Sequence, residues 1–172
     1  GPATATVSTI KVGARRDGTI TAIQAHLVYD AGAFPGAPLR SAIRRVFSHY
    51  RTPNLKIDAY DVVTNKPHVA AYRAPGATPT NFALESVIDE VGETLHMDPL
   101  AFRLKNVSRL GDPMPDGVTL PSVSLVQILQ QIQGHPCWTT PLTGPNRGRG
   151  LALGLWTMPG GTTSCHLTLS AD

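Results

Sequence analysis

Cysteine is scarce in this sequence. Its 172 residues include only two cysteines, Cys137 and Cys165. Two cysteines are too few for the disulfide framework of a small secreted protein, and their spacing matches no zinc-binding pattern. The simplest interpretation is a pair of free thiols in a reducing compartment, so we expect a cytoplasmic location.

Long hydrophobic runs and runs of like charge are also missing. No apolar stretch approaches the ~18 residues that a membrane-spanning helix needs, and no signal peptide opens the chain. Charged residues make up 16% of the sequence, the formal net charge is +3, and the basic residues form no run interleaved with aromatic residues. The sequence therefore predicts neither a membrane span nor nucleic-acid binding.

Familiar catalytic and cofactor motifs are absent as well. The sequence holds no Gly-x-Ser-x-Gly elbow, no Walker loop and no dinucleotide-binding fingerprint. The histidines lack the paired spacing that is typical of a metal site, so we predict no metal ligands among them. There are six of them: His26, His49, His68, His96, His135 and His166.

Turn residues are abundant, with 16 glycines and 15 prolines between short periodic segments. Strands and helices are mixed without a regular β-α-β repeat, which predicts an α+β fold, and 41% apolar residues suffice for a core. Asp17-Gly18 is typical of a hairpin turn. Alternation predicts strands, and helical spacing predicts helices. The strands are expected at 4–14, 20–29, 55–64, 151–157 and after Pro159-Gly160-Gly161, and the helices at 38–50, 79–95, 98–107 and from Ser122 or Ser124 to Gln133.

The stretch from Ala71 to Val107 organises the rest of the chain. It begins as a short loop shaped by Pro75-Gly76, and Thr78-Pro79 then opens a helix. The first amides of a helix lack partners and the helix dipole favours negative charge there, so the loop suits an anionic ligand. An ordinary loop before an ordinary helix is the alternative, and the spacing alone favours it.

Acidic residues follow one face of the helix predicted at 79–95, opposite its apolar residues. Paired carboxylates could serve acid–base chemistry, but the pattern favours a solvated helix face. The acidic residues are Glu85, Asp89, Glu90 and Glu93.

Four stretches are more specific in combination than any one of them is alone. They are Val12-Gly13-Ala14 with Asp17-Gly18 and Asp30-Ala31-Gly32-Ala33; Tyr50-Arg51-Thr52-Pro53-Asn54; Tyr72-Arg73-Ala74-Pro75-Gly76 with Ala83-Leu84-Glu85 and the segment 98–106; and Arg147-Gly148-Arg149-Gly150-Leu151-Ala152. This combination resembles the large, molybdopterin-binding subunit of the molybdenum hydroxylases, the family of xanthine dehydrogenase and aldehyde oxidase. The resemblance covers nearly the whole chain.

The resemblance assigns roles to residues 72–76, which look like the family's F-R-G-x-G loop beside the molybdenum centre. It implies that Arg73 is catalytic, and that Tyr72, Arg73, Ala74 and Gly76 contact the molybdenum–molybdopterin cofactor. The alternative for Arg73 is that it only braces the loop through carbonyls or a carboxylate such as Glu85. Ala74 replaces the first glycine of that loop. Ala74 also stands where carbon monoxide dehydrogenases carry a copper-binding cysteine, so copper-dependent oxidation of carbon monoxide is not expected. Pro75 replaces a phenylalanine that stacks on purine substrates in some members, which makes Pro75 the expected substrate contact and argues against a purine.

By the same resemblance, the chain is part of a larger molybdopterin-binding domain. Residues 1–135 look like part of a first subdomain, 136–147 like a connector and 148–172 like the truncated start of a second subdomain. The family's base glutamate, its other cofactor-holding segments and its iron–sulfur cysteines match nothing in these residues.

The resemblance implies a molybdenum-dependent hydroxylase that oxidises aldehydes or N-heterocycles with water as the oxygen source. Its partners would be the rest of the subunit and iron–sulfur and FAD subunits or domains. For the isolated chain we predict no bound cofactor and no activity. The alternative is a non-catalytic binding or assembly module that retains part of the fold.

Overall fold

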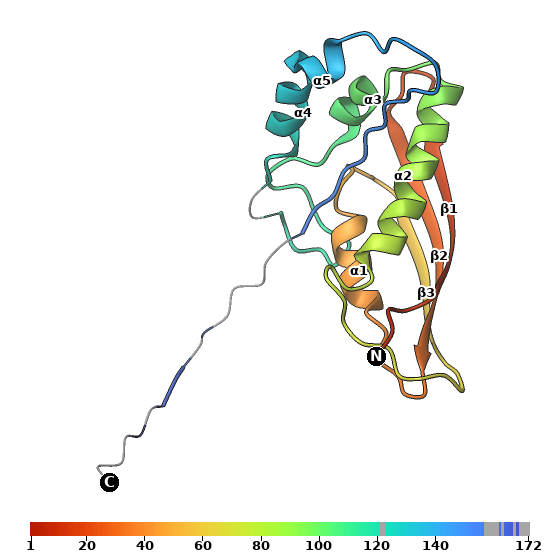
Figure 1. The fold of residues 1–172 in the computed structure, drawn as a ribbon, viewed down its shortest axis with the longest axis vertical. Helices are drawn as coiled ribbons and strands as arrows, with labels where there is room; N and C mark the ends of the chain where they lie inside the picture. Colours follow the sequence, from red (N-terminus) through yellow and green to blue (C-terminus); the bar gives the residue numbers. More distant parts are fainter. Residues whose placement is uncertain (121–122, 157–161, 163, 167, 169–172) are drawn as a thin grey trace.

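A three-stranded sheet carries helices on one of its faces in the computed structural model of the chain (Figure 1). The structure describes residues 1–120, 123–156, 162, 164–166 and 168. Their mixture of strands and helices confirms the predicted α+β class. None of the described helices is long and apolar enough to cross a membrane. The elements are β1 (Thr6–Ala14), β2 (Ile20–Gly32), α1 (Leu39–Val46), β3 (Leu55–Val63), α2 (Ala77–Thr94), α3 (Pro99–Asn106), α4 (Leu125–Gly134) and α5 (Pro136–Thr139).

Strand β2 lies in the centre of the sheet. It pairs antiparallel with β1 and parallel with β3, so that Ala25 faces Ile10 on one side and Ile57 on the other. The predicted Asp17-Gly18 turn joins β1 to β2, and Gly18 has the left-handed φ of +84° that such a turn needs. Helix α1 makes the crossover that a parallel pair requires.

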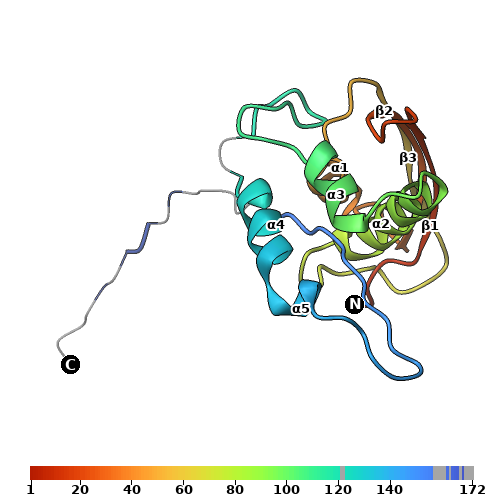
Figure 2. The ribbon, with the colours of Figure 1, turned by 90° about the horizontal axis from the view of Figure 1, so that it is seen from above.

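The core lies between one face of the sheet and the helices. Alternate residues of β2 point into it, and Ala25, Leu27 and Tyr29 are fully buried there. The other face of the sheet carries exposed side chains such as those of His26 and Tyr60. Seen from above, α1, α2 and α3 lie on the packed face, and α4 and α5 lie farther from the sheet (Figure 2).

The start of α3 follows the expected chemistry, whereas the start of α2 differs from the predicted Thr78-Pro79 opening. The Asp98 side chain accepts hydrogen bonds from the amides of Leu100 and Ala101, at 2.9 and 2.8 Å, and Pro99 occupies the first turn of α3. Helix α2 begins at Ala77, two residues before the predicted start, and Gly76 is its N-cap residue. The Tyr29 hydroxyl donates to the Gly76 carbonyl at 2.7 Å, which fastens this helix start to the sheet.

The predicted strand at 151–157 is wrong for its described part, because residues 151–156 are not in a strand. Their backbone is held by side chains of α2 instead. The Leu153 amide donates to Glu85 and the Leu153 carbonyl accepts from Asn81, at 3.0 and 2.8 Å. Thr157 and the expected turn at 159–161 lie outside the described residues. The proposed boundaries at 135 and 148 stay a prediction, although α5 lies inside the expected connector.

Candidate functional site

The loop of residues 72–76 enters α2 with its arginine exposed. Tyr72 is 76% exposed, Arg73 is exposed as well, Ala74 and Pro75 are partly buried, and Gly76 is buried. Among the described residues, no hydrogen bond or ion pair engages the Arg73 guanidinium. The structure thus places the five predicted site residues on one short segment and leaves its cation available to a ligand.

The backbone of this loop is kinked twice within three residues. Ala74 has a φ of +56° and Gly76 a φ of +71°, both in the left-handed region. A Cβ atom on Gly76 would lie 2.4 Å from the Pro38 carbonyl oxygen, so only glycine fits there. Ala74 holds a conformation that costs a non-glycine residue roughly 1–2 kcal/mol, which accounts for the glycine expected at its position. Strain of this kind is concentrated at functional sites.

The N-terminus of α2 suits a negative ligand. No acidic residue lies in its first turn, and no side chain caps it. The Ala77 amide donates a hydrogen bond to the Ala74 carbonyl at 3.0 Å, and Pro79 has no N–H. Two amides of the first turn are therefore unavailable to a ligand. What this segment offers an anion is the positive end of the helix dipole together with the Arg73 guanidinium.

The hollow at this loop is small. Residues of the loop, the N-terminal Ala3 and Thr4, and Ala70 line a cavity of about 60 Å³. Ligand pockets usually enclose roughly 300–1,000 Å³. The loop can therefore form one wall of a cofactor site, and the remaining walls must come from other segments.

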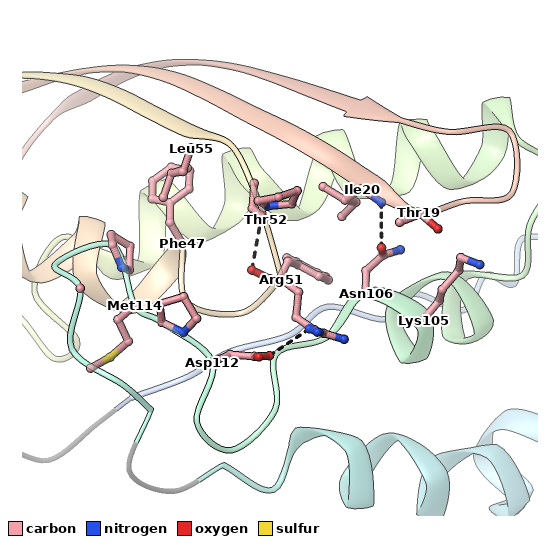
Figure 3. Close-up of a pocket in the computed structure, with 15 residues that line it drawn as sticks. Thr19, Ile20, Phe47, Arg51, Thr52, Leu55, Lys105, Asn106, Asp112 and Met114 are labelled. Atoms are coloured by element: carbon pink, nitrogen blue, oxygen red, sulfur yellow. Dashed lines mark hydrogen bonds and ion pairs between the residues drawn. The ribbon is translucent and has the colours of Figure 1, made fainter.

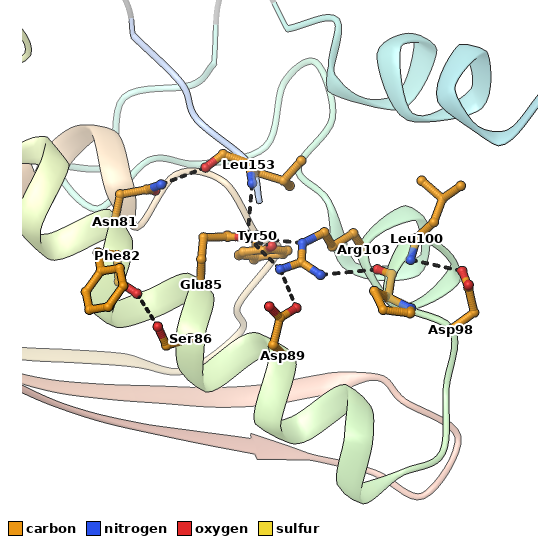
Figure 4. A network of polar contacts seen from close by, with 11 residues as sticks. Tyr50, Asn81, Phe82, Glu85, Ser86, Asp89, Asp98, Leu100, Arg103 and Leu153 are labelled. Atoms are coloured by element: carbon orange, nitrogen blue, oxygen red, sulfur yellow. Dashed lines mark hydrogen bonds and ion pairs between the residues drawn. The ribbon is translucent and has the colours of Figure 1, made fainter. Parts of the chain in front are cut away.

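Glu85 was expected on a solvated face and is instead the centre of a buried polar network (Figure 4). It is 4% exposed, accepts from the Tyr50 hydroxyl at 2.7 Å and from Arg103 Nε and Nη2 at 3.0 and 2.8 Å, and also binds the Leu153 amide. The solvated interpretation is wrong here because α3 packs beside α2 and places Arg103, itself fully buried, against this carboxylate. Burial and the Glu85 charge together raise the pKa of Tyr50 well above its usual value.

The rest of the acidic face is closer to the prediction. Asp89 is half-exposed and pairs with Arg103 Nη2 at 2.8 Å, and Glu90 and Glu93 are exposed. Sequence spacing could not distinguish Glu85 from these residues, because its partners come from three other segments. The network fastens residues 151–156 to α2, and thereby places Gly154, Leu155 and Trp156 in one pocket lining with Ala74.

A wide hollow of about 630 Å³, whose lining is drawn in Figure 3, shares no lining residue with the loop 72–76. None of the predicted site residues lines it. Its polar groups already serve the fold, since Arg51 pairs with Asp112 at 3.2 Å and Asn106 accepts from the Ile20 amide at 2.9 Å. The size of the hollow therefore does not make it the better candidate.

Metal ligands do not gather anywhere in the described part of the chain. Within it, no group of three or more His, Cys, Asp or Glu side chains is arranged to hold a metal ion. Cys137 and Cys165 are free and exposed.

The match to a family model identifies the class of protein. Residues 1–107 match the family described as the molybdopterin cofactor-binding domain. This range covers more than half of the chain and includes the candidate loop. The chain belongs to that family, and its relatives are molybdenum hydroxylases of the aldehyde oxidoreductase and xanthine dehydrogenase type.

Individual relatives agree with this assignment. The chain is 33% identical to the aldehyde oxidoreductase of Megalodesulfovibrio gigas over 128 residues, which is 72% of this chain and 14% of that protein. It is 30% identical to the nicotinate dehydrogenase large molybdopterin subunit of Eubacterium barkeri over 125 residues, or 70% and 29% of the two chains.

A solved structure shows the same fold. The aldehyde oxidoreductase from Desulfovibrio gigas superposes with a TM-score of 0.69 at 31% identity, covering 76% of this chain and 15% of that one. The chain thus spans less than a third of the length of these relatives. The activity of a whole protein of this kind is therefore a matter for proposal.

Proposed function

We propose that the chain is a portion of the large subunit of a molybdenum hydroxylase, and that the loop 72–76 forms one wall of its cofactor site. The observation that carries the proposal is the unpaired, exposed Arg73 on a doubly kinked loop at the start of α2, within the range that matches the cofactor-binding family. The substrates are aldehydes or N-heterocycles, and water supplies the oxygen. The partners are the rest of the subunit and iron–sulfur and FAD subunits or domains.

The residues of the loop divide the work. When bound, the molybdenum–molybdopterin cofactor supplies the metal centre at which a substrate carbon is oxidised. The backbone of Tyr72, Ala74 and Gly76 would hold the cofactor, and the α2 N-terminus would favour its negative charge. Arg73 offers a planar, permanently charged donor group that stabilises negative charge developing on the substrate. Pro75 contributes a compact apolar contact to the substrate side of the wall.

Labelled water tests the proposed activity directly. The complete subunit, purified with its partners, should convert an aldehyde or an N-heterocycle into a product that carries ¹⁸O from H₂¹⁸O. Product oxygen that derives from O₂, or no oxidation of either substrate class by a molybdenum-loaded enzyme, would contradict the proposal.

The isolated chain tests the incompleteness of the site. Because the loop forms only one wall of the proposed cofactor site and its hollow is about 60 Å³, the chain of residues 1–172 should purify without molybdenum and show no hydroxylase activity. Elemental analysis that finds nearly one molybdenum per chain would show that this segment is sufficient for binding.

A further inference from the structure

A second pocket adjoins the candidate loop at Ala74. It has a volume of about 290 Å³ and is bounded by the end of α1, the first turns of α2 and the segment 154–156. Its walls are largely apolar, and it shares Ala74 with the loop. The lining residues are Val46, His49, Ala74, Ala77, Thr78, Asn81, Gly154, Leu155 and Trp156.

Two polar side chains on this lining lack hydrogen-bond partners among the described residues. His49 is 1% exposed, and neither its Nδ1 nor its Nε2 is paired. The Asn81 Nδ2 group donates a hydrogen bond to the Leu153 carbonyl, whereas Asn81 Oδ1 is buried and has no partner among the described residues. Each unsatisfied buried polar group costs roughly 1–3 kcal/mol. Two such groups on one lining make this pocket a candidate ligand site.

The chemistry of these groups restricts the ligand. Burial lowers the pKa of His49 to about 4, so its ring is neutral at pH 7 and offers one donor and one acceptor. Asn81 Oδ1 can only accept. With His49 neutral, none of the described lining residues carries a charge. The Arg45 guanidinium contacts the Trp156 ring but is not part of the lining, so an ion buried in the pocket would gain no charged partner there.

The Trp156 side of the pocket favours a planar ligand group. Trp156 is one of the lining residues, and Arg45 stacks over its ring with 3.9 Å between the Arg45 Cζ and the ring centroid. An aromatic ring favours an offset-stacked or edge-to-face arrangement with another planar aromatic group.

We propose that this pocket binds a small uncharged amide on a flat apolar body. The N–H of the amide donates to Asn81 Oδ1, the amide carbonyl accepts from the His49 ring, and the apolar part contacts Val46, Leu155 and Trp156. The site differs in kind from the loop at Arg73, which presents a cation to an anionic ligand. It also stands independently of the hydroxylase proposal, since its contacts involve no metal.

Benzamide is a suitable probe because it combines an amide with a flat ring. Titration of the ¹⁵N-labelled 172-residue chain should shift the side-chain NMR signals of His49 and Asn81 in a saturable way. Benzoate, which is the charged analogue, and acetophenone, which keeps the carbonyl and lacks the N–H donor, should each bind at least about tenfold more weakly.

A matched pair of variants completes the test. His49→Phe keeps a ring and removes both nitrogens, so the chain should remain folded and bind benzamide at least about tenfold more weakly. His26→Gln, on the exposed face of the sheet, should bind as the parent does. The proposal is overturned if benzamide causes no saturable shift, if benzoate binds as tightly, or if folded His49→Phe binds unchanged.

Discussion

Arg103 directs two donors at a single oxygen of Glu85, with Nε at 3.0 Å and Nη2 at 2.8 Å from Oε2, and both side chains are almost completely buried. This pair joins α3 to α2. The same Oε2 atom also accepts a hydrogen bond from the Leu153 amide, so one carboxylate links two positions that are 68 residues apart in the sequence. The segment that faces the candidate loop is therefore positioned by a buried charge.

Removal of one partner should reveal this role. Glu85→Ala leaves the buried Arg103 guanidinium with the half-exposed Asp89 as its charged partner and the Pro99 carbonyl as an acceptor, and we expect a loss of roughly 3–5 kcal/mol in the free energy of unfolding. Asp89→Ala removes a partly solvated contact and should cost about 1 kcal/mol or less. Urea denaturation of the two variants checks this difference. Equal losses would show that burial of the Glu85 pair has no special importance.

Alanine substitutions at Gly76 and Gly111 separate the cost of a left-handed backbone from the cost of a steric clash. Both have left-handed φ angles, +71° and +86°, but an added Cβ meets the Pro38 carbonyl oxygen at 2.4 Å in the first and nothing within 4 Å in the second. Both alanine variants should lose about 1–2 kcal/mol from the strained backbone. Gly76→Ala should lose roughly 1–3 kcal/mol more from overpacking.

Thermal or urea unfolding measures both alanine variants under the same conditions. A Gly76→Ala variant that is no less stable than Gly111→Ala would contradict the close approach of the loop to Pro38.

Buried His49 should make stability depend on pH in a defined window. Its pKa is about 4 in the folded chain because of burial, against an ordinary value of 6.5. The unfolded chain therefore binds more protons between these values, and stability is complete above pH 6.5 and falls as the pH drops towards 4. The loss should be about 3 kcal/mol.

The variant His49→Phe should abolish this dependence, whereas His26→Gln should retain it. Asp30, whose pKa is lowered to about 2 by hydrogen bonds from Lys66, Thr64 and Gly32, acts in the same direction but mainly below its ordinary value of 3.8. Denaturant titrations from pH 4 to pH 7 therefore report on His49 apart from Asp30. A parent protein with constant stability over that range would refute the buried neutral histidine.

Local chemistry accounts for what the sequence could predict of the fold. The hairpin depends on Gly18 and the start of α3 on Asp98 and Pro99, and each of these acts within a few residues of itself. The α+β class follows from such local signals taken together.

Contacts between distant segments account for what could not be predicted. Glu85 has the same spacing as its solvated neighbours, and only the packing of α3 buries it. The segment 151–156 has a strand-like pattern, yet side chains of α2 take its hydrogen bonds. His49 gave no signal at all, because an unpaired buried imidazole is recognised only from its surroundings.

Arg73 gives the sharpest test of the candidate site in the complete enzyme. Its guanidinium is exposed on a loop fixed by Gly76 and Pro38, so Arg73→Ala should remove the charge without disturbing the backbone. If the cation stabilises negative charge that develops on the substrate, turnover should fall roughly 10- to 1000-fold, which corresponds to about 1.4–4 kcal/mol of transition-state stabilisation. Molybdenum content should fall less, because the backbone contacts of the loop remain.

The matched control for Arg73→Ala is Arg16→Ala, which removes another exposed arginine, at the β1–β2 turn. It should leave both turnover and molybdenum content unchanged. Activity must be expressed per bound molybdenum, since this ratio separates a loss of chemistry from a loss of cofactor. An Arg73→Ala enzyme whose activity per molybdenum equals that of the parent would show that the guanidinium takes no part in the reaction, whatever it contributes to holding the cofactor.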